Sequence, residues 1–311
     1  MTSGFLLMRT CVSNQYKCGS EFLKHIMIKC VPASTVILCL TFIYDAVLKD
    51  WSVRQVFIEL PHLLHEMLYL YLFGVSPEYY ILSVLWYIPV WMFVSVIFFN
   101  AYKYKKEFFV KIALPLLIVG AYSYLFSTWG NLADFRSIDK GGCFIKGIYR
   151  GAAGMGTGFL LYAQMPLLKN FMMRIREFAV VMMEILVIFL VILLIFSDAG
   201  SISDLFAVPS SCFILTMCYM ERGFLYRFMD LPVFKYFSGG GIYVYMAQGF
   251  AISITPILSK WIFGINNYHT FSMKVSLILV LSAIGSAILF QYIVIPFITK
   301  LICFLIFQND K

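Results

Sequence analysis

The sequence predicts an all-α fold, a polytopic integral membrane helical bundle of about eight transmembrane helices. Hydrophobic residues make up 61% of the 311 positions and charged residues only 13%, whereas a soluble domain carries about 25% charged residues. Long apolar stretches recur along the chain, and the loops between them alternate in basic content. A water-soluble fold of this length has too much surface to cover with so few charges. We therefore expect lipid to surround most of these side chains.

Each expected span is a mostly apolar stretch near the length of about 20 residues that crosses a bilayer as a helix. In chain order the spans cover residues 26–48, 81–99, 108–126, 147–166, 178–196, 205–220, 240–263 and 275–295. The sixth is short, and Pro296 after the eighth either kinks that helix or begins a surface segment. The sequence contains no internal repeat, which predicts one membrane-embedded domain over residues 1–311.

Short loops rich in Lys and Arg stay on the cytoplasmic side of a membrane. The basic residues of the N-terminal segment and of the loops after the second, fourth and sixth spans are Arg9, Lys17, Lys24, Lys103, Lys105, Lys106, Lys169, Arg174, Arg176, Arg222, Arg227 and Lys235. These loops share one side if the spans number eight, which predicts cytoplasmic N- and C-termini. Residues 129–146 are a basic exception on the outer side. Orientation thus explains the net charge of +8, and the pattern predicts no nucleic-acid binding.

Residues 53–74 are apolar but interrupted by Glu59, His62, His65 and Glu66. This pattern predicts an interfacial or re-entrant helix on the outer side of the membrane. The two histidines form no HExxH-type motif, and the eight cysteines show no CxxC spacing. We expect neither a metal site nor a disulfide framework.

Glu184 lies inside the fifth expected span, in the run VVMMEILVIFL. An ionisable side chain within a span is costly, so it is a functional candidate by default. One interpretation is a buried acid that faces a substrate cavity and acts as a catalytic base. The other is a hydrogen bond between helices, and the sequence leaves both open.

Lys24, His25 and Lys29 form a basic group at the cytoplasmic start of the first span. His25 and Lys29 lie one helical turn apart and therefore share a helix face. The group predicts either a site for the phosphates of a nucleotide-bearing molecule or an anchor whose cations reach lipid headgroups.

The fourth span begins near Arg150, after a loop that contains Asp134 and Arg136. These charges predict either interface anchors or part of a site. Residues 151–158 then read GAAGMGTG, which follows no predicted strand. Small residues at this spacing predict close helix packing rather than a phosphate-binding loop.

Five segments, taken in chain order, resemble one known family. They read MTSGFLL at 1–7, EFLKHIMIKCVPA at 21–33, LWYIPVW at 85–91, IYRGAAGMGTGFLL at 148–161 and FKYFSGGGIYVYMAQGF at 234–250. In order and spacing they resemble the multi-span membrane acyltransferases of acyltransferase family three, which move acyl groups, commonly acetyl, onto sugars of bacterial cell-surface polysaccharides. The resemblance runs along most of the chain.

The resemblance implies a protein of the bacterial inner membrane that transfers an acyl group from acyl-CoA to a hydroxyl of a cell-surface polysaccharide or its precursor. Acyl-CoA is then a donor substrate, and no bound cofactor is expected. Lys24, His25 and Lys29 are implied to bind acyl-CoA, with His25 or Glu184 as the catalytic base. The residues implied on the acceptor side are Trp86, Asp134, Arg136, Arg150 and Gln248.

The chain also departs from the family pattern. It begins at the end of the family's second span, so the histidine of the first span, thought to be the family's base, has no counterpart. Pro89 and Val90 stand where the family has Arg-Asp, and Gln248 stands where it has a histidine. The alternatives are therefore a polysaccharide transporter or flippase-like protein without catalysis, and an inactive acyltransferase remnant.

Overall fold

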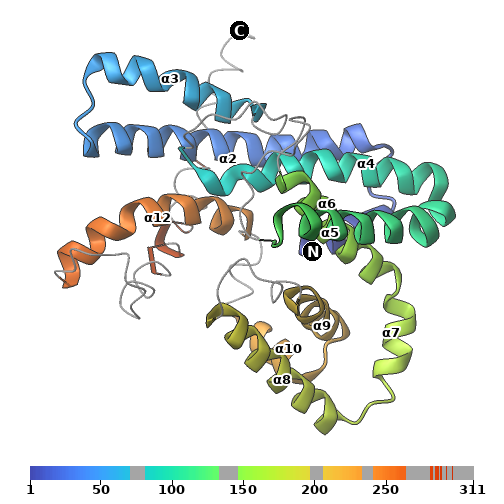
Figure 1. The fold of residues 1–311 in the computed structure, drawn as a ribbon. Coiled ribbons are helices and arrows are strands. Elements are labelled where there is room, and N and C mark those ends of the chain that lie inside the picture. Colours follow the sequence, from blue (N-terminus) through green and yellow to red (C-terminus); the bar gives the residue numbers. More distant parts are fainter. Residues whose placement is uncertain are drawn as a thin grey trace. The chain divides into compact units, whose positions relative to one another are not determined.

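The computed structural model describes residues 1–70, 81–132, 146–196, 206–232 and 241–263, with isolated positions between 281 and 296. The elements, labelled in Figure 1, are α1 Thr2–Val12, α2 Gly19–Leu48, α3 Val53–Met67, η2 Ser83–Trp86, α4 Tyr87–Phe108, η3 Phe109–Ala113, α5 Leu114–Trp129, α6 Lys146–Ala163, α7 Met165–Met172, α8 Glu177–Phe196, α9 Ala207–Met220, α10 Gly223–Met229 and α12 Gly241–Phe263. Every one of these is helical, which confirms the predicted all-α class for this part of the chain. The expected span 275–295 lies largely outside the described residues.

Three of the described stretches are long and apolar enough to cross a membrane. They are Gly19–Leu48, the 46-residue stretch Val84–Trp129 and Glu177–Leu194. Ala207–Met220 is apolar but shorter. These helices are compatible with a membrane protein, while the count of about eight spans stays a prediction from the sequence.

The helix α2 begins at Gly19, before the expected start of the first span at residue 26. Its first turn contains Glu21, whose negative charge is stabilised by the positive end of the helix dipole. The Glu21 carboxylate also accepts the backbone N–H of Lys17 at 2.7 Å. The start of α2 is also held against α4, because Gly19 N–H donates to Asn100 Oδ1 at 3.1 Å. The helix therefore extends through a polar turn that hydropathy alone excludes from the span.

The helices α4 and α5 overlap the second and third expected spans, 81–99 and 108–126, but both begin six residues later than expected. Between them the backbone leaves helical geometry at Lys105, where φ is −142° and ψ is 55°, and the π-helix η3 follows. The predicted basic loop between these spans is thus a helix break flanked by helical turns. Pro115 follows at the start of α5, a position that needs no intrahelical N–H donor.

The chain divides into two compact units, the first made of Met1–Met27, Tyr71–Ser76 and Trp86–Tyr236, the second of Ile28–Leu70, Pro77–Leu85 and Phe237–Lys311. In the first unit α6 packs against α1, α4 and α5. Its glycines allow this: a Cβ at Gly158 would meet the backbone of Met1 and Phe5, and one at Gly151 would meet the side chain of Val90. The prediction that the glycine run lets helices pack closely is confirmed.

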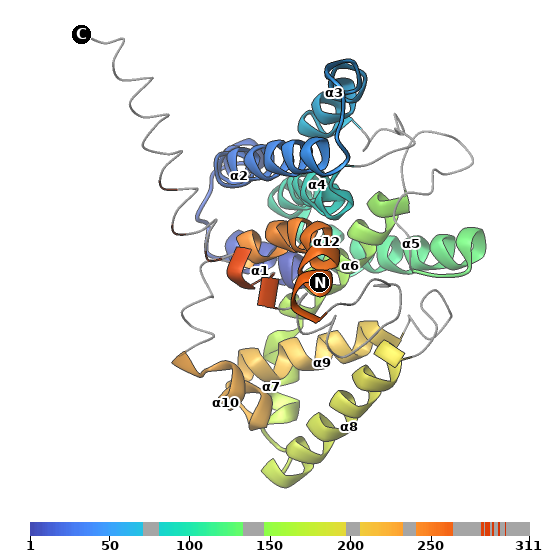
Figure 2. The ribbon, with the colours of Figure 1, turned by 90° about the vertical axis from the view of Figure 1, so that its left-hand side faces the viewer.

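Also in the first unit, α8, α9 and α10 pack against one another, as Figures 1 and 2 show. Met172, Val180 and Met217 form the buried cluster of this group. The opposite side of α8 is apolar and uncovered, with Phe178 77% exposed and Leu186 66% exposed. A ridge of this kind is unfavourable in water and suits hydrocarbon.

In the second unit, α3 starts at Ser52, whose hydroxyl accepts the Gln55 N–H at 3.3 Å as an N-cap. Its exposed apolar side chains include Val53, Phe57 and Ile58. The segment predicted at 53–74 is thus helical over Val53–Met67, and residues 71–74 lie outside the described part; its interfacial position stays a prediction.

Candidate functional site

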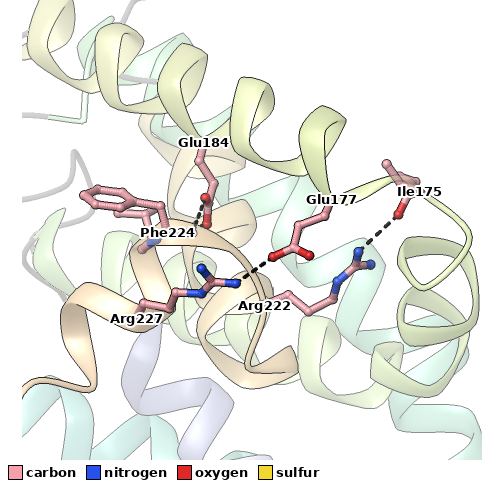
Figure 3. Close-up of polar contacts among 7 residues, drawn as sticks. Ile175, Glu177, Glu184, Arg222, Phe224 and Arg227 are labelled. Atoms are coloured by element: carbon pink, nitrogen blue, oxygen red, sulfur yellow. Dashed lines mark hydrogen bonds and ion pairs between the residues drawn. The ribbon is translucent and has the colours of Figure 1, made fainter.

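Glu184 is completely buried on α8, and both of its carboxylate oxygens bind the start of α10 (Figure 3). Oε2 accepts the backbone N–H of Phe224 at 2.7 Å, and Oε1 accepts that of Leu225 at 3.2 Å. Gly223, the residue before Phe224, has a φ of +84°, and a Cβ at Gly223 would collide with the Glu184 carboxylate. Glu184 therefore caps α10 from a neighbouring helix, the hydrogen-bonded arrangement that the sequence left as one of two interpretations.

Arg222 lies beside this cap and holds the end of α7 (Figure 3). Its guanidinium donates to the carbonyl oxygens of Met172 at 2.6 Å and Ile175 at 3.1 Å. An arginine suits this role because its fork of N–H donors can satisfy the carbonyls left open at a helix end. From its sequence position, Arg222 indicated only the orientation of the spans. The available signal was the polar Glu221–Arg222–Gly223 turn directly after an apolar run, which is typical of a helix end.

Arg227 and Glu177 form a second contact between α10 and α8, at 2.8 Å. Both side chains are exposed, so this ion pair adds little to stability. The buried cap of Glu184, rather than the exposed pair, therefore fixes α10 on α8.

The basic group of Lys24, His25 and Lys29 lies on the first turns of α2, and all three side chains are exposed. The His25 ring lies 5.5 Å from that of Tyr16. On the buried side of the same turns, Phe22 stacks on Phe99 with ring centroids 5.6 Å apart. The buried contact anchors the helix start, while the basic group is open to an anionic ligand.

The acceptor-side candidates are only partly brought together. The Arg150 guanidinium lies over the Trp86 ring at 5.6 Å, within the range of a cation–π interaction. Asp134 and Arg136 lie outside the described residues. Gln248 is exposed on α12, in the second unit.

A neighbouring polar contact at the start of α6 was not anticipated. Lys146 is 1% exposed, its ammonium donates to Asn131 Oδ1 at 2.7 Å, and it lies over the Trp129 ring at 5.5 Å. Tyr149 lies against Trp129, with ring centroids 6.2 Å apart. Because a buried cation is costly unless it is held by partners, Lys146 is a structural anchor of this helix end.

Glu66 on α3 is a second buried acid, 1% exposed. It accepts the backbone N–H of Ile81, and that of Leu82 at 3.1 Å. Burial raises the pKa of Glu66 to about 7, against the opposing effect of these two hydrogen bonds. Nearby, His62 contacts Glu59 at 4.0 Å. Within the described ranges, no three His, Cys, Asp or Glu side chains gather to hold a metal ion.

The segment held by Glu66 leads into the LWYIPVW motif. In the second unit α12 packs on the same segment, because the Tyr245 hydroxyl donates to the Val84 carbonyl and Gly249 leaves room for Leu82. Glu66 therefore helps to fix the backbone that leads into η2, a helix that ends at Trp86.

Comparison with known protein families, curated proteins and solved structures finds no match to this chain.

Proposed function

We propose that this chain is a membrane-bound acyltransferase-like protein with about eight spans and both termini in the cytoplasm. It transfers an acyl group, acetyl in the simplest case, from acyl-CoA to a hydroxyl of a bacterial cell-surface polysaccharide or its precursor. The ordered set of motifs that resembles acyltransferase family three supports this proposal. The observation that carries it is the exposure of Lys24, His25 and Lys29, on the helix start that resembles the family's basic helix.

The donor carries phosphates, so it needs cations at an accessible surface. Lys24 and Lys29 meet this need, because both are exposed on the first turns of a helix that is anchored on its other side by Phe22. A ligand that binds here displaces water rather than packed protein.

The reaction needs a base. The sugar hydroxyl attacks the thioester carbonyl, the base takes its proton, the C–S bond breaks and coenzyme A leaves as a thiol after taking up a proton. Of the two proposed bases, His25 is the more suitable, because both oxygens of Glu184 already accept backbone hydrogen bonds. On the acceptor side, Arg150 and the face of Trp86 are proposed to contact a part of the glycan at the outer end of the spans, whereas His25 acts at their cytoplasmic end.

The test is acetyl transfer from labelled acetyl-CoA to extracted cell-surface polysaccharide by membranes that contain the chain. We expect label on the glycan with wild-type protein and a strong loss with His25→Asn. A matched variant, Lys17→Gln, removes an exposed cation before α2 and should keep full activity. Absence of transfer by well-folded wild-type protein would contradict the proposal.

The second candidate is a non-catalytic membrane protein, either a polysaccharide transporter or flippase-like protein or an inactive acyltransferase remnant. A function without catalysis is favoured by the hydrogen bonds of Glu184, because both of its carboxylate oxygens are used to cap α10. Movement of a labelled glycan across reconstituted vesicles without any acyl transfer would support the transporter over the enzyme.

A further inference from the structure

A groove of about 520 Å³ lies wholly within the first unit, at the ends of α1, α4, α6 and α9 and along η3 and α7. Three lysines line it: Lys106 from α4, Lys111 from η3 and Lys169 from α7. We call it the lysine groove. The proposed acyl transfer uses none of these residues.

The lysine groove is basic. All three lysine side chains are exposed. Glu107, which also lines the groove, pairs with Lys111 at 2.5 Å and so neutralises one of them. The Lys106 ammonium lies 5.6 Å from the centroid of the Tyr102 ring, and both residues line the groove. A net positive charge remains, and it favours an anionic ligand.

The rest of the lining is apolar or aromatic. Met8 and Met165 are buried in its wall, and Tyr162 and Tyr219 present their rings. An amphipathic lining of this kind matches a ligand that has both an anionic head and hydrocarbon chains. A small inorganic anion would leave the apolar wall in contact with water.

The place of the groove along the chain suits a lipid. Lys106 and Lys111 lie on either side of the junction between α4 and η3, one and six residues after the break at Lys105. Both lie within the apolar stretch Val84–Trp129. A polar turn between two apolar helices belongs at the membrane surface, where tyrosines and lysines gather. Basic pockets between spans on the cytoplasmic side bind acidic headgroups.

We infer that the lysine groove binds the headgroup of an acidic phospholipid, with the phosphate between Lys106 and Lys169 and the acyl chains against the methionine wall. The charge of the groove and its apolar lining select an acidic phospholipid over a zwitterionic one, whose cationic ammonium group would face the lysines.

The test titrates the delipidated full-length protein in detergent with phosphatidylglycerol or phosphatidylcholine and counts bound lipids by native mass spectrometry. We expect phosphatidylglycerol to bind at least tenfold more tightly than phosphatidylcholine. The triple variant Lys106→Gln, Lys111→Gln, Lys169→Gln should lose this preference. The matched control, Lys17→Gln, Lys105→Gln, Lys260→Gln, removes three exposed lysines that do not line the groove and should keep it.

The inference would be overturned if the triple variant preferred phosphatidylglycerol to phosphatidylcholine as strongly as the wild type does. So would displacement of phosphatidylglycerol by micromolar free coenzyme A, which would assign the groove to a nucleotide instead. If the triple variant does not fold, Lys169→Gln alone gives the same comparison with a smaller loss. Acyl transfer is measured in a separate assay, so either proposal can fail while the other stands.

Discussion

The Glu184 carboxylate accepts the backbone N–H of Phe224 at 2.7 Å, although the two residues lie on different helices and Glu184 is completely buried. Acidic groups stabilise the N-terminus of a helix because its first N–H groups lack intrahelical partners. In an apolar environment, an unpaired carboxylate and an unpaired backbone N–H are each unfavourable. This contact provides both with a hydrogen-bond partner.

Glu184→Gln tests whether this residue is a cap or a base. The amide keeps one acceptor oxygen and turns an NH₂ donor toward the second backbone N–H, so we expect the free energy of unfolding to fall by about 1–3 kcal/mol. Thermal unfolding in detergent measures this. Glu177→Gln, which breaks only the exposed pair with Arg227, should change stability by less than about 1 kcal/mol. A fully stable but inactive Glu184→Gln protein would favour the catalytic role.

Gly223→Ala tests the same cap from the other side. A Cβ at Gly223 meets the Glu184 carboxylate, and its φ of +84° is unfavourable for any L side chain. We expect a loss of at least about 1 kcal/mol in unfolding free energy and a lower thermal midpoint. Gly120→Ala is the matched control, because nothing lies within 4 Å of a Cβ at that position in α5. It should be neutral or mildly stabilising, and equal destabilisation by both variants would argue against the cap.

Lys24→Gln with Lys29→Gln tests the donor site. Loss of two exposed cations should raise the KM for acyl-CoA about tenfold and leave kcat nearly unchanged, since these residues bind phosphate rather than the reacting atoms. Steady-state acyl transfer at varied acyl-CoA concentration measures both constants. An unaltered KM would return the two lysines to the role of membrane anchors.

Glu66 should make stability depend on pH. Its pKa of about 7 in the folded protein lies above its ordinary value of 4.5. The folded state therefore holds the proton more tightly, and stability falls as pH rises between these two values. From pH 5 to 8 we expect a loss of about 2 kcal/mol, seen as a lower thermal midpoint, with a smaller loss in Glu66→Gln. Parallel pH profiles for the two proteins would contradict this.

Cys18 should react faster with maleimide than the other cysteines of the described residues. It is exposed, whereas Cys11 and Cys30 are buried and Cys39, Cys212 and Cys218 are half-buried. A hydrogen bond with the Ser20 side chain, 3.0 Å away, lowers the pKa of its thiol and raises the thiolate fraction.

The same reaction tests the proposed orientation. A membrane-impermeant maleimide should label Cys18 in inverted vesicles and leave it unlabelled in intact cells. Cys18→Ser identifies the signal by removing it. Labelling from outside intact cells would reverse the proposed topology.

Local sequence patterns predicted most of the helices. The expected span 178–196 and the helix Glu177–Phe196 nearly coincide, because apolar length is a property of neighbouring residues. The glycine run of α6 was likewise interpreted correctly from its spacing. Helix starts were less predictable, since Gly19 begins α2 through a contact with Asn100, a residue distant in the chain.

That the described chain is helical and apolar could be predicted from sequence alone, because hydropathy and helix length are set by adjacent side chains. The roles of the isolated charges became visible only once the helices were seen packed together. Glu184 has its hydrogen-bond partners about 40 residues away, and Lys106 and Lys169 both line one groove, although they belong to separate helices. Such partners depend on how helices pack, and this information is not contained in any local stretch of sequence.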